Sequence, residues 1–222
     1  MTAIDFFFDT VSPYSWLAFE RLPQVLEGRS YAVRYQPVLF AGLLGIWGQK
    51  GPAEIAPKRA WTYRQVRWLA ARQGTTLELP RPHPFNPLAL QRLALACAEP
   101  GGTPNRWVVE TLFRHVWCRD GADPNDPAAL AALTAQLAPQ RDPQAAELKV
   151  ELRARTDAAA ASGVFGVPTL RADGRDFFGQ DGLDALAAML HGDPWFDSSA
   201  WDDAGQQPAG IERSRRSAGL QG

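Results

Sequence analysis

Hydrophobic and polar positions change their period along the chain, and the first part alternates between strand-like and helix-like patterns. Residues 3–10 form a short, aromatic-rich apolar run that stops at turn-forming residues, which predicts a buried strand. Residues 13–27 place apolar positions at a helical spacing, and Pro23 is expected to kink this helix. Residues 31–38 alternate and predict a second strand. Strand, helix and strand in this order predict a βαβ unit with parallel strands.

A long helical block follows this unit. From about residue 52 to 162 the chain shows helical periodicity and almost no strand character, as in the apolar face formed between Val109 and Trp117. Strand-like sequence returns in residues 167–178 with a hairpin turn at Asp173-Gly174, and residues 180–190 predict a final helix. The order of elements therefore predicts an α/β fold in which a helical block interrupts a βαβ and a ββα unit.

The domain boundaries follow from these changes of pattern. We assign residues 1–50 and 163–195 to one α/β domain and residues 51–162 to an inserted helical domain. Residues 196–222 are expected to form a flexible C-terminal tail, because most of this segment offers little apolar surface to bury.

Composition and charge narrow the classes of partner. Of 222 residues, 45% are hydrophobic, which is ordinary for a globular core, and the formal net charge of −1 favours neither nucleic acid nor a membrane surface as partner. Cys97 and Cys118 are the two cysteines, and their spacing predicts neither a disulfide framework nor a redox pair. We find no signal peptide and no apolar run long enough to span a bilayer, so we expect a cytoplasmic protein.

Metal and nucleotide motifs are weak. His83, His115 and His191 lie far apart, and the pair His115 and Cys118 offers two ligands where a metal site needs more. We therefore expect structural roles for these side chains and no bound metal. The chain has no nucleophile elbow, no P-loop and no dinucleotide glycine fingerprint.

Ser12 has two competing interpretations. Four predicted helix starts place a capping residue before proline: Ser12-Pro13, Asn86-Pro87, Asp126-Pro127 and Asp142-Pro143. This shared sequence pattern favours Ser12 as an N-cap residue that stabilises its helix by about 1 kcal/mol. Ser12 also follows the first strand of a parallel unit, at the edge of a sheet where ligands gather and where a helix N-terminus favours an anion such as a thiolate.

The chain resembles a known family at this point. The order of elements, together with "GVPT" at 166–169, resembles the DsbA-like branch of the thioredoxin fold, in which a C-P-x-C motif opens the first helix. Here Ser12-Pro13-Tyr14-Ser15 stands in that place, which excludes disulfide exchange by this motif. "FFFDTVSPYSWLA" and "FFGQDGLDAL" resemble instead 2-hydroxychromene-2-carboxylate isomerase and the kappa-class glutathione transferases, over roughly residues 3–191.

The resemblance implies glutathione as the cofactor. It assigns the cofactor site to Ser12, Val167, Pro168, Gly179, Gln180 and Asp181. Ser12 would be catalytic and favour the thiolate, Val167 would pair with the cysteinyl backbone, and Pro168 would be cis. Gln180 and Asp181 would hold the γ-glutamyl end, with capping of the last helix as a competing role for Asp181.

The resemblance also implies an aromatic carboxylate as the substrate. Between Lys50 and Arg72 there are six basic residues and one acidic residue. Lys50, Lys58 and Arg59 lie best for pairing with the substrate carboxylate or with the glycyl end of glutathione, whereas a solvated helix face is favoured for the other three. The family often has asparagine where this chain has Gln49, near its substrate contacts. Asn86 in "HPFNPLAL" matches a further family pattern, with helix capping as its competing role.

In the expected reaction the nucleophile comes from glutathione and not from the protein. A glutathione thiolate adds to a conjugated system, the former double bond rotates, and elimination regenerates glutathione. We therefore expect a glutathione-dependent isomerase of an aromatic-degradation intermediate, and a homodimer like its relatives. A kappa-like transferase or peroxidase is the first alternative, and a non-catalytic thioredoxin-fold protein that binds glutathione is the second.

Overall fold

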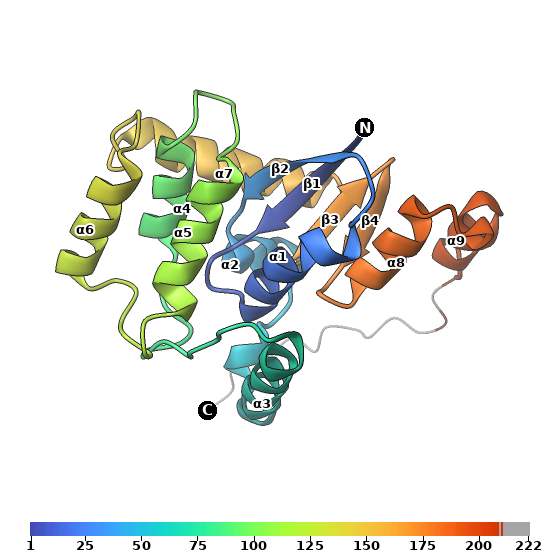
Figure 1. The fold of residues 1–222 in the computed structure, drawn as a ribbon, viewed down its shortest axis with the longest axis horizontal. Helices are drawn as coiled ribbons and strands as arrows, with labels where there is room; N and C mark the ends of the chain where they lie inside the picture. The colour runs from blue at the N-terminus through green and yellow to red at the C-terminus, as the bar shows by residue number, and fades with distance from the viewer. Residues whose placement is uncertain (209, 211–222) are drawn as a thin grey trace, which may run out of the picture. The chain divides into compact units, whose positions relative to one another are not determined.

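The computed structural model describes residues 1–208 and 210, and the described chain falls into two compact units that divide between Ala187 and Ala188. The first unit contains a sheet with the strand order β2-β1-β3-β4 (Figure 1). Strand β1 (Thr2–Phe8) pairs in parallel with β2 (Tyr31–Pro37) and antiparallel with β3 (Thr169–Ala172). Strand β4 (Arg175–Phe178) completes the predicted hairpin with β3. The parallel βαβ unit and the α/β fold class are confirmed.

The helical block lies between β2 and β3 along the chain. The helices of the first unit are α1 (Pro13–Val25), α2 (Phe40–Trp47), the short 3-10 helix η1 (Pro52–Glu54), α3 (Ala56–Gln73), α4 (Leu88–Ala96), α5 (Arg106–Trp117), α6 (Pro127–Leu137) and α7 (Ala146–Ala161), followed by α8 (Gly182–Leu190), which continues past the unit boundary. Figure 1 shows α4, α5 and α6 side by side, away from the hairpin strands. No helix in the described part of the chain is long and apolar enough to cross a membrane.

One aromatic cluster joins the inserted helices to the sheet. Phe113 of α5 packs with its ring centroid 5.5 Å from Phe8 of β1 and 5.4 Å from Phe19 of α1. Trp16 of α1 lies 5.7 Å from the same ring, and all four side chains are fully buried. The helical block and the α/β part therefore share a core in the first unit. The assignment of residues 51–162 to a domain of their own stays a prediction.

Two of the four predicted helix starts are confirmed. Ser12 caps α1 by accepting a hydrogen bond from the N–H of Ser15, and Asp126 caps α6 by accepting one from the N–H of Ala129. In both helices the following proline occupies the first turn, where its missing N–H would have no partner in the helix.

The other two predicted helix starts are wrong. Asn86 Oδ1 accepts from the N–H of Leu88, 3.1 Å away, and α4 begins at Leu88 itself. Asp142 Oδ1 accepts from the N–H of Gln144, 2.8 Å away, and α7 begins only at Ala146. In each case the short polar side chain closes a turn two residues long instead of capping a helix.

The first part of the expected C-terminal tail contains helical structure, and the flexibility of segment 196–222 stays a prediction. The second unit contains a 3-10 helix η2 (Pro194–Asp197) and a short helix α9 (Ala200–Gly205). Within this unit the ring of Phe196 lies 5.0 Å from Trp195 and 5.6 Å from Trp201. Aromatic packing therefore accompanies helical structure in the first part of segment 196–222. Residues 209 and 211–222 of the expected tail lie outside the described residues.

Candidate active site

Ser12 lies at the N-terminus of α1 and reaches the loop before β3. Its Oγ accepts a hydrogen bond from the N–H of Ser15 at 3.2 Å and donates one to the backbone oxygen of Val167 at 3.4 Å. The side chain is 6% exposed. Ser12 is therefore the cap that the sequence favoured, and its hydroxyl proton also points toward a second segment of the chain.

The loop before β3 and the loop after β4 are bonded to each other. The peptide bond between Val167 and Pro168 is cis, as expected, and the backbone oxygen of Pro168 accepts a hydrogen bond from the N–H of Gly179 at 2.9 Å. Gly179 has a φ of +84°, and the carboxylate of Asp181 lies where a Cβ at Gly179 would stand. Glycine is therefore required here by its backbone conformation and by the lack of space.

Gln180 contacts α3, and the charge of Asp181 acts on Tyr14 of α1. The side chain of Gln180 accepts a hydrogen bond from Gln73 of α3 at 2.8 Å. Asp181 is exposed, and its charge contributes, after burial, to raising the pKa of Tyr14 in α1. The structure thus brings all six residues of the predicted cofactor site onto adjoining segments.

Ser12 and Val167 open into a cavity of about 490 Å³. Its walls come from the loop between β1 and α1, from α2, η1 and α3, and from residues 83–87. Most of the lining is apolar or aromatic, including Val11, Phe40, Leu44, Phe85 and Phe178. No lysine or arginine belongs to the described residues that line it. The cavity therefore suits a largely apolar ligand beside Ser12.

The predicted substrate residues fall into two groups. Asn86 lines the cavity. Gln49 and Lys50 follow α2, Lys58 lies in the first turn of α3, and these three side chains are exposed and outside the described lining. Their role in holding a carboxylate stays a prediction.

Asp9 anchors the loop that carries Ser12. Its side chain is fully buried, and its two oxygens accept hydrogen bonds from the N–H of Val11 at 3.1 Å and of Phe40 at 2.8 Å. Burial raises the pKa of this carboxyl from 3.8 to about 7, although the two hydrogen bonds act in the opposite direction. Because Phe40 is the first residue of α2, Asp9 ties this helix to the loop before α1.

His83 also holds the loop that carries Ser12. Its Nε2 lies 2.9 Å from the backbone oxygen of Val11, and its Nδ1 lies 2.9 Å from the hydroxyl of Tyr63. A carbonyl oxygen only accepts, so Nε2 carries the proton and Nδ1 is the acceptor in the neutral ring. Burial lowers the pKa of His83, which favours this neutral form.

Asp9, Tyr63 and His83 were not predicted as site residues. Asp9 stands in the stretch "FFFDT", where the pattern predicts a turn former, and His83 stands three positions before the motif residue Asn86. Asp9 and His83 lie close to recognised motif residues in the sequence, and this proximity is the signal that could have identified them as site residues. Tyr63 carries no comparable signal.

No cysteine belongs to the described residues that line the cavity. Cys97 and Cys118 lie elsewhere, and burial raises the pKa of Cys97 to about 11 and also raises that of Cys118. Both thiols therefore stay protonated near neutral pH. Ser15 takes the place of the second motif cysteine, and its hydroxyl is fully buried with no partner among the described residues.

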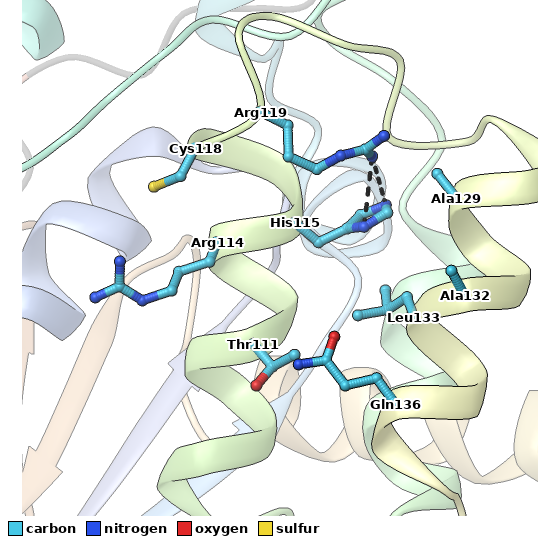
Figure 2. Close-up of a pocket in the computed structure, with 9 residues that line it drawn as sticks. All are labelled: Thr111, Arg114, His115, Cys118, Arg119, Ala129, Ala132, Leu133 and Gln136. Atoms are coloured by element: carbon cyan, nitrogen blue, oxygen red, sulfur yellow. Dashed lines mark hydrogen bonds between the residues drawn. The ribbon is translucent and has the colours of Figure 1, made fainter.

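His115 and Cys118 do not converge on a common point. Both line a second cavity of about 460 Å³ beside α5 and α6, where Figure 2 shows the Cys118 sulfur directed away from the His115 ring. The Nε2 atom of His115 lies 2.9 Å from the backbone oxygen of Pro124. This contact agrees with the structural role that we expected for His115, and the expectation of no bound metal stays a prediction.

The groups around Ser12 fit a peptide thiol. No described residue accepts a hydrogen bond from the N–H of Val167, although this residue is only 5% exposed and lines the cavity. A buried N–H without a partner is costly, and an added peptide strand would satisfy it. The N-terminus of α1 also favours an anion, such as a thiolate, beside Ser12.

Fold and site together define a thioredoxin-like protein whose first helix begins with serine in place of cysteine. The model of the DSBA-like thioredoxin domain matches residues 3–191, and the chain belongs to this family. The fold that we predicted is thereby confirmed.

Two groups of curated relatives match most of the chain. Glutathione S-transferase kappa 1 of Rattus norvegicus is 27% identical over 208 residues, which cover 86% of this chain and 92% of the relative. The 2-hydroxychromene-2-carboxylate isomerase of Sphingobium xenophagum is 27% identical over 195 residues, which cover 84% and 97%. A solved structure of a 2-hydroxychromene-2-carboxylate isomerase superposes with a TM-score of 0.74 at 21% identity, and covers 88% of this chain and 97% of its own. The resemblance to both groups is confirmed.

Proposed function

We propose that this chain is a glutathione-dependent isomerase that acts on 2-hydroxychromene-2-carboxylate or a similar aromatic-degradation intermediate. One observation carries the proposal. Ser12 opens at a helix N-terminus into a mostly apolar cavity, beside the N–H of Val167, which has no acceptor among the described residues, while both cysteines lie outside the described lining. The relatives named as isomerases and as kappa glutathione transferases support glutathione as the missing thiol.

The residues of this chain would bind and orient the cofactor. Bound glutathione would supply a thiolate, which adds to a conjugated double bond, permits rotation about it and leaves again. Ser12 would donate its hydroxyl proton to the sulfur, and the positive end of α1 would favour the charged form. Val167 would donate its N–H to the cysteinyl backbone, and Asp181 would attract the γ-glutamyl ammonium group.

The remaining walls would receive the substrate. Phe40, Phe85 and Phe178 offer apolar faces for an aromatic ring, and Asn86 offers an amide. Lys50 and Lys58 are exposed outside the cavity lining, so the substrate carboxylate would point toward solvent to meet them.

A kappa-like glutathione transferase is the second candidate function. The absence of lysine and arginine from the described lining favours it, because an uncharged electrophile needs no cationic partner in the cavity. The two functions share the thiolate and differ in the fate of glutathione.

The deciding experiment is turnover of 2-hydroxychromene-2-carboxylate with and without glutathione. Isomer formation that depends on catalytic amounts of glutathione supports the isomerase. Consumption of one glutathione for each product supports the transferase. Binding of glutathione without turnover of this substrate or of an aryl halide would overturn the isomerase and the transferase proposals. It would support a non-catalytic glutathione-binding protein.

A further inference from the structure

Tyr63 and His83 form a bonded pair on the wall of the cavity. The Tyr63 hydroxyl on α3 lies 2.9 Å from Nδ1 of His83 and 2.8 Å from the backbone oxygen of the same residue. The two rings meet edge to face with centroids 5.4 Å apart. Both residues line the cavity that Ser12 enters.

The direction of these hydrogen bonds is determined by their acceptors. His83 uses its Nε2 proton for the backbone oxygen of Val11, so Nδ1 holds a lone pair. The single hydroxyl proton of Tyr63 is therefore directed to His83, at Nδ1 or at the backbone oxygen. Toward a ligand, the Tyr63 oxygen then presents lone pairs, which accept a hydrogen bond from a ligand hydroxyl.

Three other polar residues of the lining have no titratable base as a hydrogen-bond partner in the described part of the chain. The hydroxyl of Tyr14 donates to Gln65 Oε1 at 2.7 Å, and an amide oxygen takes up no proton near neutral pH. Both oxygens of Asp9 are occupied by backbone N–H groups, and Glu54 accepts a hydrogen bond from Gly51. Tyr63 is different because the group behind its hydroxyl is an imidazole nitrogen, which can take up a proton.

We propose that Tyr63 is a catalytic residue for opening the substrate ring, and that His83 is the positioning residue that receives its proton. This inference rests on the proposed isomerase function. It assigns the Tyr63 oxygen to the substrate hydroxyl, which sits on the carbon next to the ring oxygen.

The proton and the electron pairs balance in this step. The substrate hydroxyl gives its proton to the Tyr63 oxygen while the Tyr63 proton moves to Nδ1 of His83. The hydroxyl oxygen becomes a carbonyl oxygen, the bond from its carbon to the ring oxygen breaks, and the ring oxygen leaves with the electron pair as a phenolate. The phenolate then takes a proton from Tyr63 as His83 returns one, so both residues regain their starting states.

The test compares Tyr63→Phe and His83→Gln with the wild type on 2-hydroxychromene-2-carboxylate at saturating glutathione. Phenylalanine removes the hydroxyl, and glutamine retains an N–H donor for Val11 but takes up no proton. We expect kcat to fall about 100-fold in each variant, with KM and the glutathione-induced shift of the melting temperature unchanged. We expect the double variant to lose no more than either single variant, because the two residues act as one unit.

Two controls separate proton transfer from damage to the site. Tyr31→Phe, at the start of β2 and outside the described lining of the cavity, should keep the wild-type kcat. An aryl halide without a hydroxyl group should be conjugated by Tyr63→Phe at the wild-type rate, because that reaction needs no proton transfer at this oxygen.

The possible outcomes distinguish a failure of the roles of Tyr63 and His83 from a failure of the proposed isomerase function. Wild-type kcat in Tyr63→Phe, losses that multiply in the double variant, or an equal loss with the aryl halide would overturn the roles of Tyr63 and His83 alone. A wild-type protein that shows no isomerase turnover would overturn these roles together with the proposed function. If His83→Gln does not fold, Tyr63→Phe and its solvent isotope effect decide, since removal of proton transfer from the limiting step should abolish that effect.

Discussion

The hydroxyl of Ser12 donates a hydrogen bond to the backbone oxygen of Val167, although 155 positions separate the two residues in the sequence. The contact joins the N-terminus of α1 to the loop that contains the cis peptide bond. At 3.4 Å it is a long hydrogen bond, and such bonds are weak. A ligand sulfur that competes for the Ser12 proton would therefore displace only a weak interaction.

Substitution of Ser12 by aspartate tests whether this residue does more than cap its helix. Aspartate caps as well as serine, but it has no hydroxyl proton and places a negative charge beside the sulfur and the oxygen of Val167. We expect Ser12→Asp to fold, to raise the pKa of the bound glutathione thiol and to lose most turnover. Thiolate ultraviolet absorbance against pH, measured with bound glutathione, checks this result.

Ser12→Ala is the matched variant. It leaves the backbone donors of α1 in place, so the thiol pKa should change less than in Ser12→Asp, while the free energy of unfolding falls by about 1 kcal/mol through the lost cap. If Ser12→Asp keeps full activity and an unshifted thiol titration, Ser12 acts only as a helix cap.

Glutathione should stabilise the folded chain. A ligand that binds only the folded state adds about 2.7 kcal/mol to the free energy of unfolding at about a hundredfold excess over its dissociation constant. Thermal unfolding across a glutathione series measures this shift, with S-methyl glutathione as the control that lacks a free thiol. Unchanged melting at millimolar glutathione would remove the basis of the proposed function.

The two cysteines should be dispensable for activity. Neither Cys97 nor Cys118 lines the cavity beside Ser12, and burial keeps both thiols protonated. We expect the double variant Cys97→Ala and Cys118→Ala to retain turnover, with a small decrease in melting temperature because both side chains are partly buried. A double variant that folds but has lost all turnover would show that one of these sulfurs is the nucleophile.

Asp9 should make the stability of the chain depend on pH. Its pKa in the folded state is raised from 3.8 to about 7, so the folded chain retains this proton where the unfolded chain has lost it. The corresponding stabilisation is complete below the unfolded pKa and is lost as the pH rises through the folded one. We therefore expect the free energy of unfolding to fall across this range in the wild type.

Asp9→Asn should flatten that dependence. Its amide cannot accept from both Val11 and Phe40, so one buried N–H loses its partner at a cost of about 1–3 kcal/mol. Denaturant unfolding at several pH values measures both effects. A variant with the same slope as the wild type would show that another group titrates in this range.

Local patterns were sufficient to predict most of the fold. The βαβ unit followed from short apolar runs around a helical spacing, and the hairpin turn followed from Asp173 and Gly174, which have positive φ angles of 49° and 77°. The predicted starts of α4 and α7 were wrong because Asn86 and Asp142 are equally able to close a short turn or to cap a helix. Only the three-dimensional course of the chain distinguishes these two roles.

The cavity was less predictable than the motifs around it. Motif residues such as Ser12 and Pro168 stood out by resemblance, whereas Tyr63 and His83 gain their position through contacts that join separate elements. His83 meets Val11 across 72 positions of the chain, and no periodicity in either segment encodes that meeting. Substrate contacts depend on how α2 and α3 are placed, which local sequence does not determine.

The walls of the cavity come from segments that are separate in the chain. Ser12 and Val167 belong to the α/β part, whereas Thr62 and Tyr63 come from α3 in the insertion. Substitutions on α3 can therefore reshape the space for a ligand without touching the surroundings of the Ser12 hydroxyl. Such a separation of the walls allows selectivity to diverge during evolution, or to be engineered, while Ser12 and the Tyr63 hydroxyl are both retained.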